Sequence, residues 1–204
     1  MSVFFTSDSH FGHKNIVRSL SDWSNKDQCR DFFSIEDMNR VLIEGINRVV
    51  APTDTLYHLG DFNFGGLHNL HTFRRAIRCE TVHLILGNHD FKHGSVDPRD
   101  VDHQFASVGA YREIVVEGQE IILNHYAQRV WNRQSKGSWH LYGHSHGRLP
   151  RLKNFSLDVG VEGQGFFAPF PYSMNSLRAV FQSDSIYCED EHASSENSAP
   201  INSN

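Results

Sequence analysis

The chain has 204 residues, of which 39% are hydrophobic and 21% charged, as is typical of one globular domain. No apolar run approaches the roughly 18 residues that a membrane-spanning helix needs. The N-terminus lacks the basic stretch of a signal peptide, so we expect a cytoplasmic protein. The net charge of −5 arises beyond Arg178, where five acidic residues and no basic ones occur. The rest of the chain has 19 acidic and 19 basic residues and lacks the positive excess of proteins that grip long nucleic acids.

The first half of the chain predicts alternating strands and helices. Apolar and β-branched runs predict strands at residues 3–7, 55–59 and 81–86. Apolar residues at helical spacing predict mostly helical structure over residues 11–50 and a helix over 67–78. This β-α-β-α-β order favours a layered α/β fold.

The second half predicts mainly strands. Residues 112–116 and 120–123 flank Gly118-Gln119, which indicates a β-hairpin with glycine in its turn. Short strands are expected at 139–142 and 156–159. The whole pattern predicts an α/β (α+β) fold in which helices cover a pair of mixed sheets.

One domain is expected over residues 1–182, because no linker or internal repeat interrupts it. Residues 183–204 are rich in Ser, Asn, Asp and Glu, which predicts a disordered acidic tail. The three cysteines are widely spaced and odd in number, and we interpret them as incidental thiols: Cys29, Cys79 and Cys188.

Five short polar clusters each follow a strand-like run. They are Asp8-Ser9-His10, Gly60-Asp61, Gly87-Asn88-His89-Asp90, Asn124-His125 and Gly143-His144-Ser145-His146. Because strand ends at one edge of an α/β sheet converge on a common crevice, we expect these clusters to meet. Carboxylates mixed with imidazoles, without a thiolate, suit first-row divalent cations.

Each cluster also has an ordinary structural interpretation. An Asp and a His two residues apart are common on surfaces, and Gly87-Asn88 readily forms a turn. A lone histidine such as His125 is more often a core or surface residue than a ligand. Five such clusters in this order, each after a predicted strand, are difficult to explain as independent accidents, so we interpret them together as a metal site.

The ordered set resembles the calcineurin-like metallophosphoesterase superfamily, and in particular a compact, cap-less bacterial and phage branch. The motifs are read as Asp8-x-His10, Gly60-Asp61, Gly87-Asn88-His89-Asp90, His125 and Gly143-His144-x-His146. The resemblance implies a four-layer αββα sandwich of two mixed sheets flanked by helices, which agrees with the predicted order of segments.

By the same resemblance, two divalent metal ions are expected. One would be held by Asp8, His10, Asp61 and His146, and Asp61 would bridge to a second that is completed by Asn88, His125 and His144. We expect Mn, although the mixed nitrogen and oxygen ligands also admit Fe, Zn, Co or Ni.

The resemblance implies hydrolysis of a phosphate ester by a hydroxide that bridges the two metal ions. Asp61 and His89 are the expected catalytic residues: Asp61 sets the metal separation, and an unligated His89 protonates the leaving oxygen. The chain departs from the motifs of protein Ser/Thr phosphatases at residues Phe62 to Gly66 and at Asp90, which makes that branch of the superfamily a poor match. Asn63 and Asp90 are both candidates to orient His89.

Further polar residues near the motifs are candidates for binding the substrate. His13, Lys14 and Arg129 could bind phosphate oxygens. Trp131 or Phe62 could stack on a base, and Arg133 could also contact phosphate. The simpler interpretation is that Trp131 belongs to the core and Arg133 is a solvated surface charge.

The expected substrate is a phosphomonoester or phosphodiester, either a nucleotide or another small molecule. A nuclease or RNA-end phosphatase with the same site is the alternative within the enzyme class, so nucleic acid is a less favoured partner. A non-catalytic metal-binding scaffold is the alternative from another class. The oligomeric state is left open by the sequence.

Overall fold

The computed structural model describes residues 1–91, 103–163 and 165–185, and its first sheet has five strands. Their order is β4-β3-β2-β1-β9, with bounds β1 (Val3–Thr6), β2 (Thr55–His58), β3 (Thr81–Ile85), β4 (Ser107–Gly109) and β9 (Tyr172–Ser173). Strands β1 to β4 are parallel, whereas β9 is antiparallel to β1. The three strands predicted in the first half of the chain are therefore neighbours, and their C-terminal ends lie at one edge.

The second sheet has four strands in the order β5-β6-β7-β8. Their bounds are β5 (Tyr111–Val116), β6 (Gln119–Asn124), β7 (Trp139–Tyr142) and β8 (Ser156–Asp158). Glu117 and Gly118 connect β5 to β6 with φ angles of 50° and 79°, the geometry of a tight hairpin turn. The predicted hairpin is confirmed, and because β6, β7 and β8 are parallel, both sheets are mixed.

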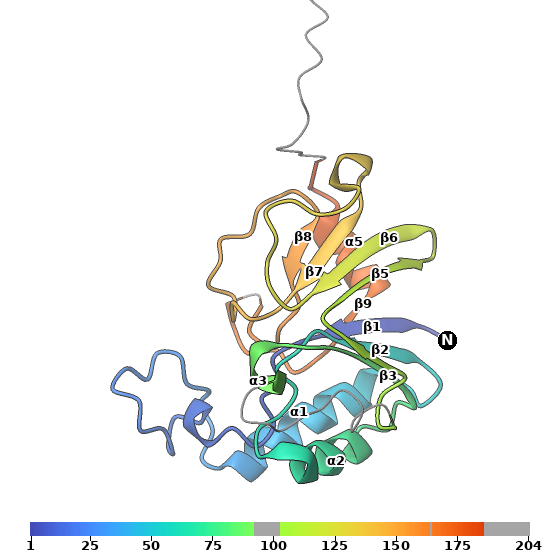
Figure 1. The fold of residues 1–204 in the computed structure, drawn as a ribbon. Helices are drawn as coiled ribbons and strands as arrows, with labels where there is room; N and C mark the ends of the chain where they lie inside the picture. Colours follow the sequence, from blue (N-terminus) through green and yellow to red (C-terminus); the bar gives the residue numbers. More distant parts are fainter. Residues whose placement is uncertain (92–102, 164, 186–204) are drawn as a thin grey trace, which may run out of the picture.

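Helices cover the outer face of the first sheet (Figure 1). On α1 (Ile35–Val49), Met38, Leu42 and Ile46 are buried against strand residues, and Leu70 of α2 (Gly66–Ala76) joins the same cluster. A second apolar cluster joins the two sheets and includes α5 (Met174–Phe181). These observations confirm the predicted α/β fold of two mixed sheets flanked by helices.

The prediction of mostly helical structure over residues 11–50 is wrong for its first half. Between β1 and α1 the segment contains only a short 3-10 turn, η1 (Lys14–Ile16), and it projects beyond the sheets (Figure 1). The segment is rich in Ser, Asn and Asp, which compete with helical hydrogen bonds. Ser19 Oγ donates to the carbonyl of Phe32, for example. Helix α1 begins only where Ser34 Oγ accepts a hydrogen bond from the Asp37 N–H.

The C-terminal part contains elements that the sequence analysis did not predict. These include β9 and α5, and the packed part of the chain continues beyond residue 182. Asp184 accepts hydrogen bonds from the Arg151 guanidinium at 2.7 Å and from the Phe155 N–H at 2.9 Å. The predicted disordered tail from residue 186 onward, including Cys188, lies outside the described residues, whereas Cys29 and Cys79 are free thiols.

Within the described part of the chain, no helix combines the length and the apolar character needed to cross a bilayer.

A loop with one 3-10 turn, η2 (Gln134–Lys136), packs against the second sheet, where Asn132 Nδ2 donates to Glu113 Oε2 at 2.9 Å. Beneath it, the fully buried His140 of β7 packs against Trp131, with ring centroids 5.3 Å apart. His140 Nε2 accepts from the Gln128 N–H at 3.0 Å, and Nδ1 lies 3.3 Å from the Ile122 carbonyl. Burial lowers the pKa of His140 to about 4, so the ring stays neutral while the fold is intact.

We predict that His140 makes the fold less stable as the pH falls. In the unfolded chain this ring takes up a proton near pH 6.5, whereas in the folded chain it does so only near pH 4. Lowering the pH from 7 to 5 should therefore favour unfolding by about 2 kcal/mol through this one residue. In urea titrations at both pH values, His140→Gln should show a loss of stability smaller by that amount. The control His68→Gln, at an exposed histidine, should lose as much stability between pH 7 and pH 5 as the wild type does. If His140→Gln also loses as much as the wild type, His140 is not the source of this pH dependence.

Candidate active site

The segments that follow β1 and β2 run side by side past the ends of their strands. The Asp8 N–H donates to the Gly60 carbonyl at 3.0 Å, and the His10 N–H donates to the Asp61 carbonyl at 2.9 Å. Five residues of the predicted site have left-handed backbone conformations, which are uncommon outside glycine: Asp8, His10, Asp61, His144 and His146. Backbone strain of this kind clusters at functional sites, where the surrounding structure maintains it.

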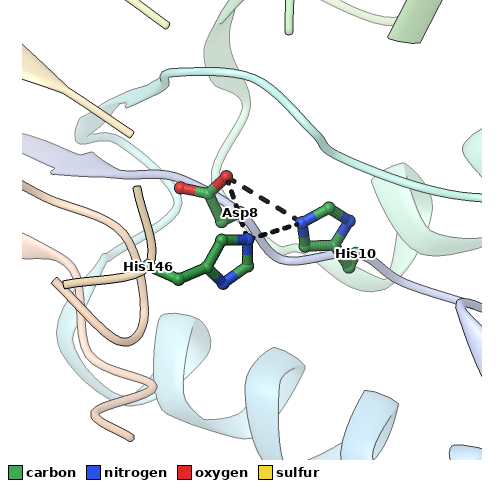
Figure 2. A group of neighbouring side chains, drawn as sticks. All are labelled: Asp8, His10 and His146. Atoms are coloured by element: carbon green, nitrogen blue, oxygen red, sulfur yellow. Dashed lines mark hydrogen bonds and ion pairs between the residues drawn. The ribbon is translucent and has the colours of Figure 1, made fainter. Parts of the chain in front are cut away.

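A first group of possible metal ligands consists of Asp8, His10 and His146, whose nitrogen and oxygen atoms lie within 4.8 Å of one another. Figure 2 shows the two rings turned toward each other beside the carboxylate, with the Nε2 atoms 3.2 Å apart. Asp8 Oδ1 lies 3.9 Å from His10 Nε2 and 3.8 Å from His146 Nε2. Burial raises the pKa of the Asp8 carboxyl to about 7, although the nearby His146 and His125 act in the opposite direction.

A second group consists of Asp61, His125 and His144. Asp61 Oδ2 lies 3.5 Å from His125 Nε2 and 3.6 Å from His10 Nε2, so this one oxygen atom stands between the two groups. Asn88 Oδ1 lies 3.3 Å from His125 Nε2. The structure therefore brings all seven predicted metal residues together from five separate segments.

The donor atoms of both groups fit divalent cations. Carboxylate oxygens, an amide oxygen and imidazole nitrogens converge, and this mixture suits first-row metals. His125 Nδ1 donates to the Leu59 carbonyl at 2.7 Å, which directs the lone pair of Nε2 into the site. His144 is exposed, whereas the other members of the two groups are buried or half-buried.

His146 is oriented by residues that the sequence analysis did not find. Its Nδ1 donates to Glu162 Oε2 at 3.1 Å, and Arg30 forms an ion pair with the same carboxylate. Arg30 also donates to the carbonyls of Ser9 at 2.7 Å and Asp8 at 2.6 Å. Burial opposes ionisation of Glu162, but Arg30 and His146 lower its pKa to about 2, so the carboxylate stays charged. Its hydrogen bond keeps the proton on His146 Nδ1 and leaves Nε2 free to bind a metal.

Two further buried carboxylates hold the loops of the site in place. Asp90 accepts hydrogen bonds from the N–H groups of Asp61, Phe62 and Gly87, at 2.8, 3.0 and 2.8 Å. Asp158 accepts from the Gly147 N–H at 3.0 Å and from the Gly160 N–H at 2.8 Å. Asp90 was predicted only as a residue that orients His89, and Asp158 was not predicted.

The glycine of the third cluster is required by close packing. A Cβ atom at Gly87 would overlap Asp61 Oδ1 and crowd the His125 ring. The same holds in the last cluster, where a Cβ atom at Gly143 would overlap Ser7 Oγ and the Asp8 carboxylate. Both glycines therefore permit the backbone to approach the ligands.

His89 stands beside the two groups. Its backbone N–H donates to Asp61 Oδ1 at 2.9 Å, its Nε2 lies 3.9 Å from Asp61 Oδ2, and about a third of its side chain is exposed. The ring packs against Phe64, with centroids 4.7 Å apart, and against His10 at 5.4 Å. Asn63 and Asp90 were the two candidates to orient His89. The Asn63 amide donates to the carbonyls of Phe64 and Gly66, and the Asp90 carboxylate accepts from backbone N–H groups, so the described contacts of both side chains are with backbone atoms.

A cavity of about 300 Å³ adjoins the site. Four of its lining residues belong to the predicted clusters, namely His10, His89, His144 and His146. His13, Trp23 and Arg148 also line it, whereas Lys14 and Arg129 are exposed and lie outside its lining. Trp23 and Arg148 were missed because they belong to no motif.

His13 forms one wall of this cavity. Its ring stacks on Phe64 with centroids 3.8 Å apart. Burial lowers the pKa of His13 to about 4, which favours the neutral ring near pH 7.

The suggestion that Phe62 stacks on a base is wrong, because this side chain is fully buried between Phe11 and Phe105. Trp131 is also buried, and its Nε1 donates to the Ser138 carbonyl, so the core interpretation holds. Arg133 is exposed and forms an ion pair with Glu120, as expected of a surface charge.

The family model of the calcineurin-like phosphoesterase superfamily domain matches residues 1–157. The chain belongs to this superfamily. This calcineurin-like phosphoesterase is accordingly a metal-dependent enzyme that hydrolyses phosphate esters. Its family implies divalent metal ions, and the His and Asp groups described above could hold them.

Two curated relatives span most of the phosphoesterase. Protein MJ1445 of Methanocaldococcus jannaschii is 28% identical over 168 residues, which cover 78% of this chain and 81% of the relative. The Gene 66 protein of Mycobacterium phage D29 is 28% identical over 174 residues, which cover 74% and 81%. The crystal structure of AQ665 from Aquifex aeolicus, a protein of unknown function, superposes with a TM-score of 0.62 at 22% identity, over 88% of this chain and 98% of that one. This last similarity concerns the fold.

We predict that Glu162→Gln weakens metal binding by about 10- to 100-fold, because the neutral amide no longer pairs with Arg30 or fixes the proton on His146 Nδ1. Calorimetric titration of the metal-free variant with Mn²⁺ measures this change. Glu80→Gln, at an exposed glutamate outside the site, is the matched control and should bind like the wild type. Equal affinities for Glu162→Gln and the wild type would show that Glu162 does not position His146.

Proposed function

We propose that the protein hydrolyses a phosphate monoester or diester of a nucleotide or another small molecule at a centre of two divalent metal ions, with Mn favoured. One ion would be held by Asp8, His10, Asp61 and His146, and the second by Asp61, Asn88, His125 and His144. The observation that carries the proposal is the position of Asp61 Oδ2, which lies 3.6 Å from His10 Nε2 and 3.5 Å from His125 Nε2.

When bound, two divalent cations withdraw charge from the phosphoryl oxygens and acidify the attacking water. The chain then has to supply a proton to the departing oxygen. His89 suits this role because its ring lines the cavity, about a third of it is exposed, and it stands beside both groups of ligands. The hydrogen bond from its backbone N–H to Asp61 Oδ1 holds His89 next to the carboxylate that would bridge the two ions.

The surroundings of the site support a small substrate. A cavity of about 300 Å³ lies at the lower end of the range for small-molecule sites. Arg148 lies at its edge and could bind a non-bridging phosphate oxygen, and His13 could donate or accept a hydrogen bond. Apart from its acidic end, the chain carries as many acidic as basic residues, which is unfavourable for gripping long nucleic acids.

The competing functions make different demands on the same residues. A nuclease or RNA-end phosphatase would bind oligonucleotides with an affinity that falls steeply as salt is raised. A non-catalytic scaffold needs neither a complete ligand set nor a proton donor. Since all seven candidate ligands and His89 are brought together, an enzyme is the better-supported function.

We predict that His89→Asn reduces turnover of an alkyl phosphate ester by about 100- to 10,000-fold, because a poor leaving group depends on the proton that His89 supplies. Hydrolysis of p-nitrophenyl esters, whose leaving group needs little protonation, should fall much less. The metal content of the variant, measured by elemental analysis, should stay near that of the wild type.

Two controls accompany this assay. Wild-type enzyme treated with a chelator should lose activity toward both kinds of ester, because the reaction depends on metal. His68→Gln, at an exposed histidine on α2, should leave both rates unchanged. Hydrolysis of the alkyl ester at the wild-type rate by His89→Asn would exclude His89 as the proton donor, and equal rates with and without chelator would refute the metal mechanism.

A further inference from the structure

We propose that the substrate is a phosphodiester that joins two nucleosides, each of which binds in its own cavity on either side of His146 and Arg148. This inference rests on the proposed function, because the scissile phosphate would occupy the same metal centre. It adds the class of substrate and the residues that select it.

A second cavity, of about 350 Å³, adjoins the first. The two cavities share Gln28, His146 and Arg148 in their linings, so these residues form the boundary between them. The metal-binding groups lie on the side of the first cavity, which His10, His89 and His144 also line. The second cavity contains none of the other candidate metal ligands.

The orientation of His146 places the cleavage centre next to this boundary. Its Nε2 faces Asp8 and His10, as Figure 2 shows, whereas its Nδ1 faces Glu162, which lines the second cavity. A phosphate bound near Nε2 therefore lies within reach of both spaces. A phosphomonoester has one organic group and would leave one cavity unused, whereas a phosphodiester has two.

Each cavity presents an aromatic ring on which a base could stack. In the first, Trp23 is 36% exposed. In the second, Phe166 is 64% exposed, and its neighbour Phe167 is fixed by an edge contact with Phe32, at 5.3 Å between centroids. Base stacking on aromatic side chains is tolerant of sequence and contributes about 1–3 kcal/mol per base.

The charges around the two cavities favour a single phosphate between neutral nucleosides. Arg148 lies at the boundary, where it could bind a phosphate oxygen. Asp27 and Asp31 are exposed carboxylates that line the second cavity, and they would repel a further phosphate there while accepting hydrogen bonds from sugar hydroxyls. Both volumes lie at the lower end of the range for small-molecule sites, which suits one nucleoside in each.

The test measures binding of a dinucleoside methylphosphonate, an uncharged analogue that resists hydrolysis and does not depend on bound metal. Calorimetric titration should show a dissociation constant about 5- to 100-fold weaker for Phe166→Ala than for the wild type. Trp23→Ala should weaken binding by a similar factor. Phe33→Ala removes an exposed phenylalanine outside both cavities and should bind like the wild type.

A second measurement uses activity. With Mn²⁺ present, kcat/KM for a dinucleoside monophosphate divided by kcat/KM for p-nitrophenyl phosphate should fall in Phe166→Ala by about the factor seen in binding. The inference is overturned if the wild type does not bind the analogue at millimolar concentration, or if Phe166→Ala binds as well as the wild type. Metal-dependent hydrolysis of p-nitrophenyl phosphate would then still support the proposed function. If the wild type binds the analogue through Phe166 but hydrolyses neither ester in the presence of Mn²⁺, the proposed function fails, and the two cavities form a binding site without a substrate.

Discussion

The carboxylate of Asp61 is the feature on which the rest of the site depends. One of its oxygens stands between His10 and His125, and the other accepts the backbone N–H of His89. Its backbone has a φ angle of 53°, which an aspartate adopts only when the surroundings hold it there. Asp90 provides that restraint by accepting hydrogen bonds from the N–H groups of Asp61 and Phe62 at this turn and from the Gly87 N–H after β3. The conformation that positions Asp61 is therefore maintained by a neighbour that binds its backbone and is not itself a candidate ligand.

The two sheets contribute to the site in different ways. The parallel strands of the first sheet bring Asp8, Asp61 and Asn88 to one edge, since each follows the end of its own strand. The second sheet supplies His125 after β6 and the His144 to His146 loop after β7, and the apolar cluster between the sheets fixes their separation. Ligands more than a hundred residues apart in sequence can thus approach within hydrogen-bonding distance, as His10 and His146 do at 3.2 Å.

Sequence reasoning found the parts of the site whose signal is local. Asp8, His10, His144 and His146 occur in short clusters after predicted strands, and such clusters can be recognised without coordinates. Glu162 and Arg30 could not be found in this way, because their partnership spans 132 residues and neither lies in a cluster. The segment before α1 is not helical as predicted, because its polar side chains bond to nearby backbone groups and compete with helical hydrogen bonds. Helix α5 buries Met174, Leu177 and Phe181, but its eight residues are too few for helical spacing to give a strong signal.

Crystals grown with Mn²⁺ would test the central claim most directly, through the anomalous scattering of the metal. The account predicts two peaks about 3.5–4 Å apart with the Asp61 carboxylate between them. One peak would be surrounded by the first group of ligands, around Asp8, and the other by the second group, around His125. A single peak that Asp61 does not share with a second site, or peaks remote from Asp61, would contradict it.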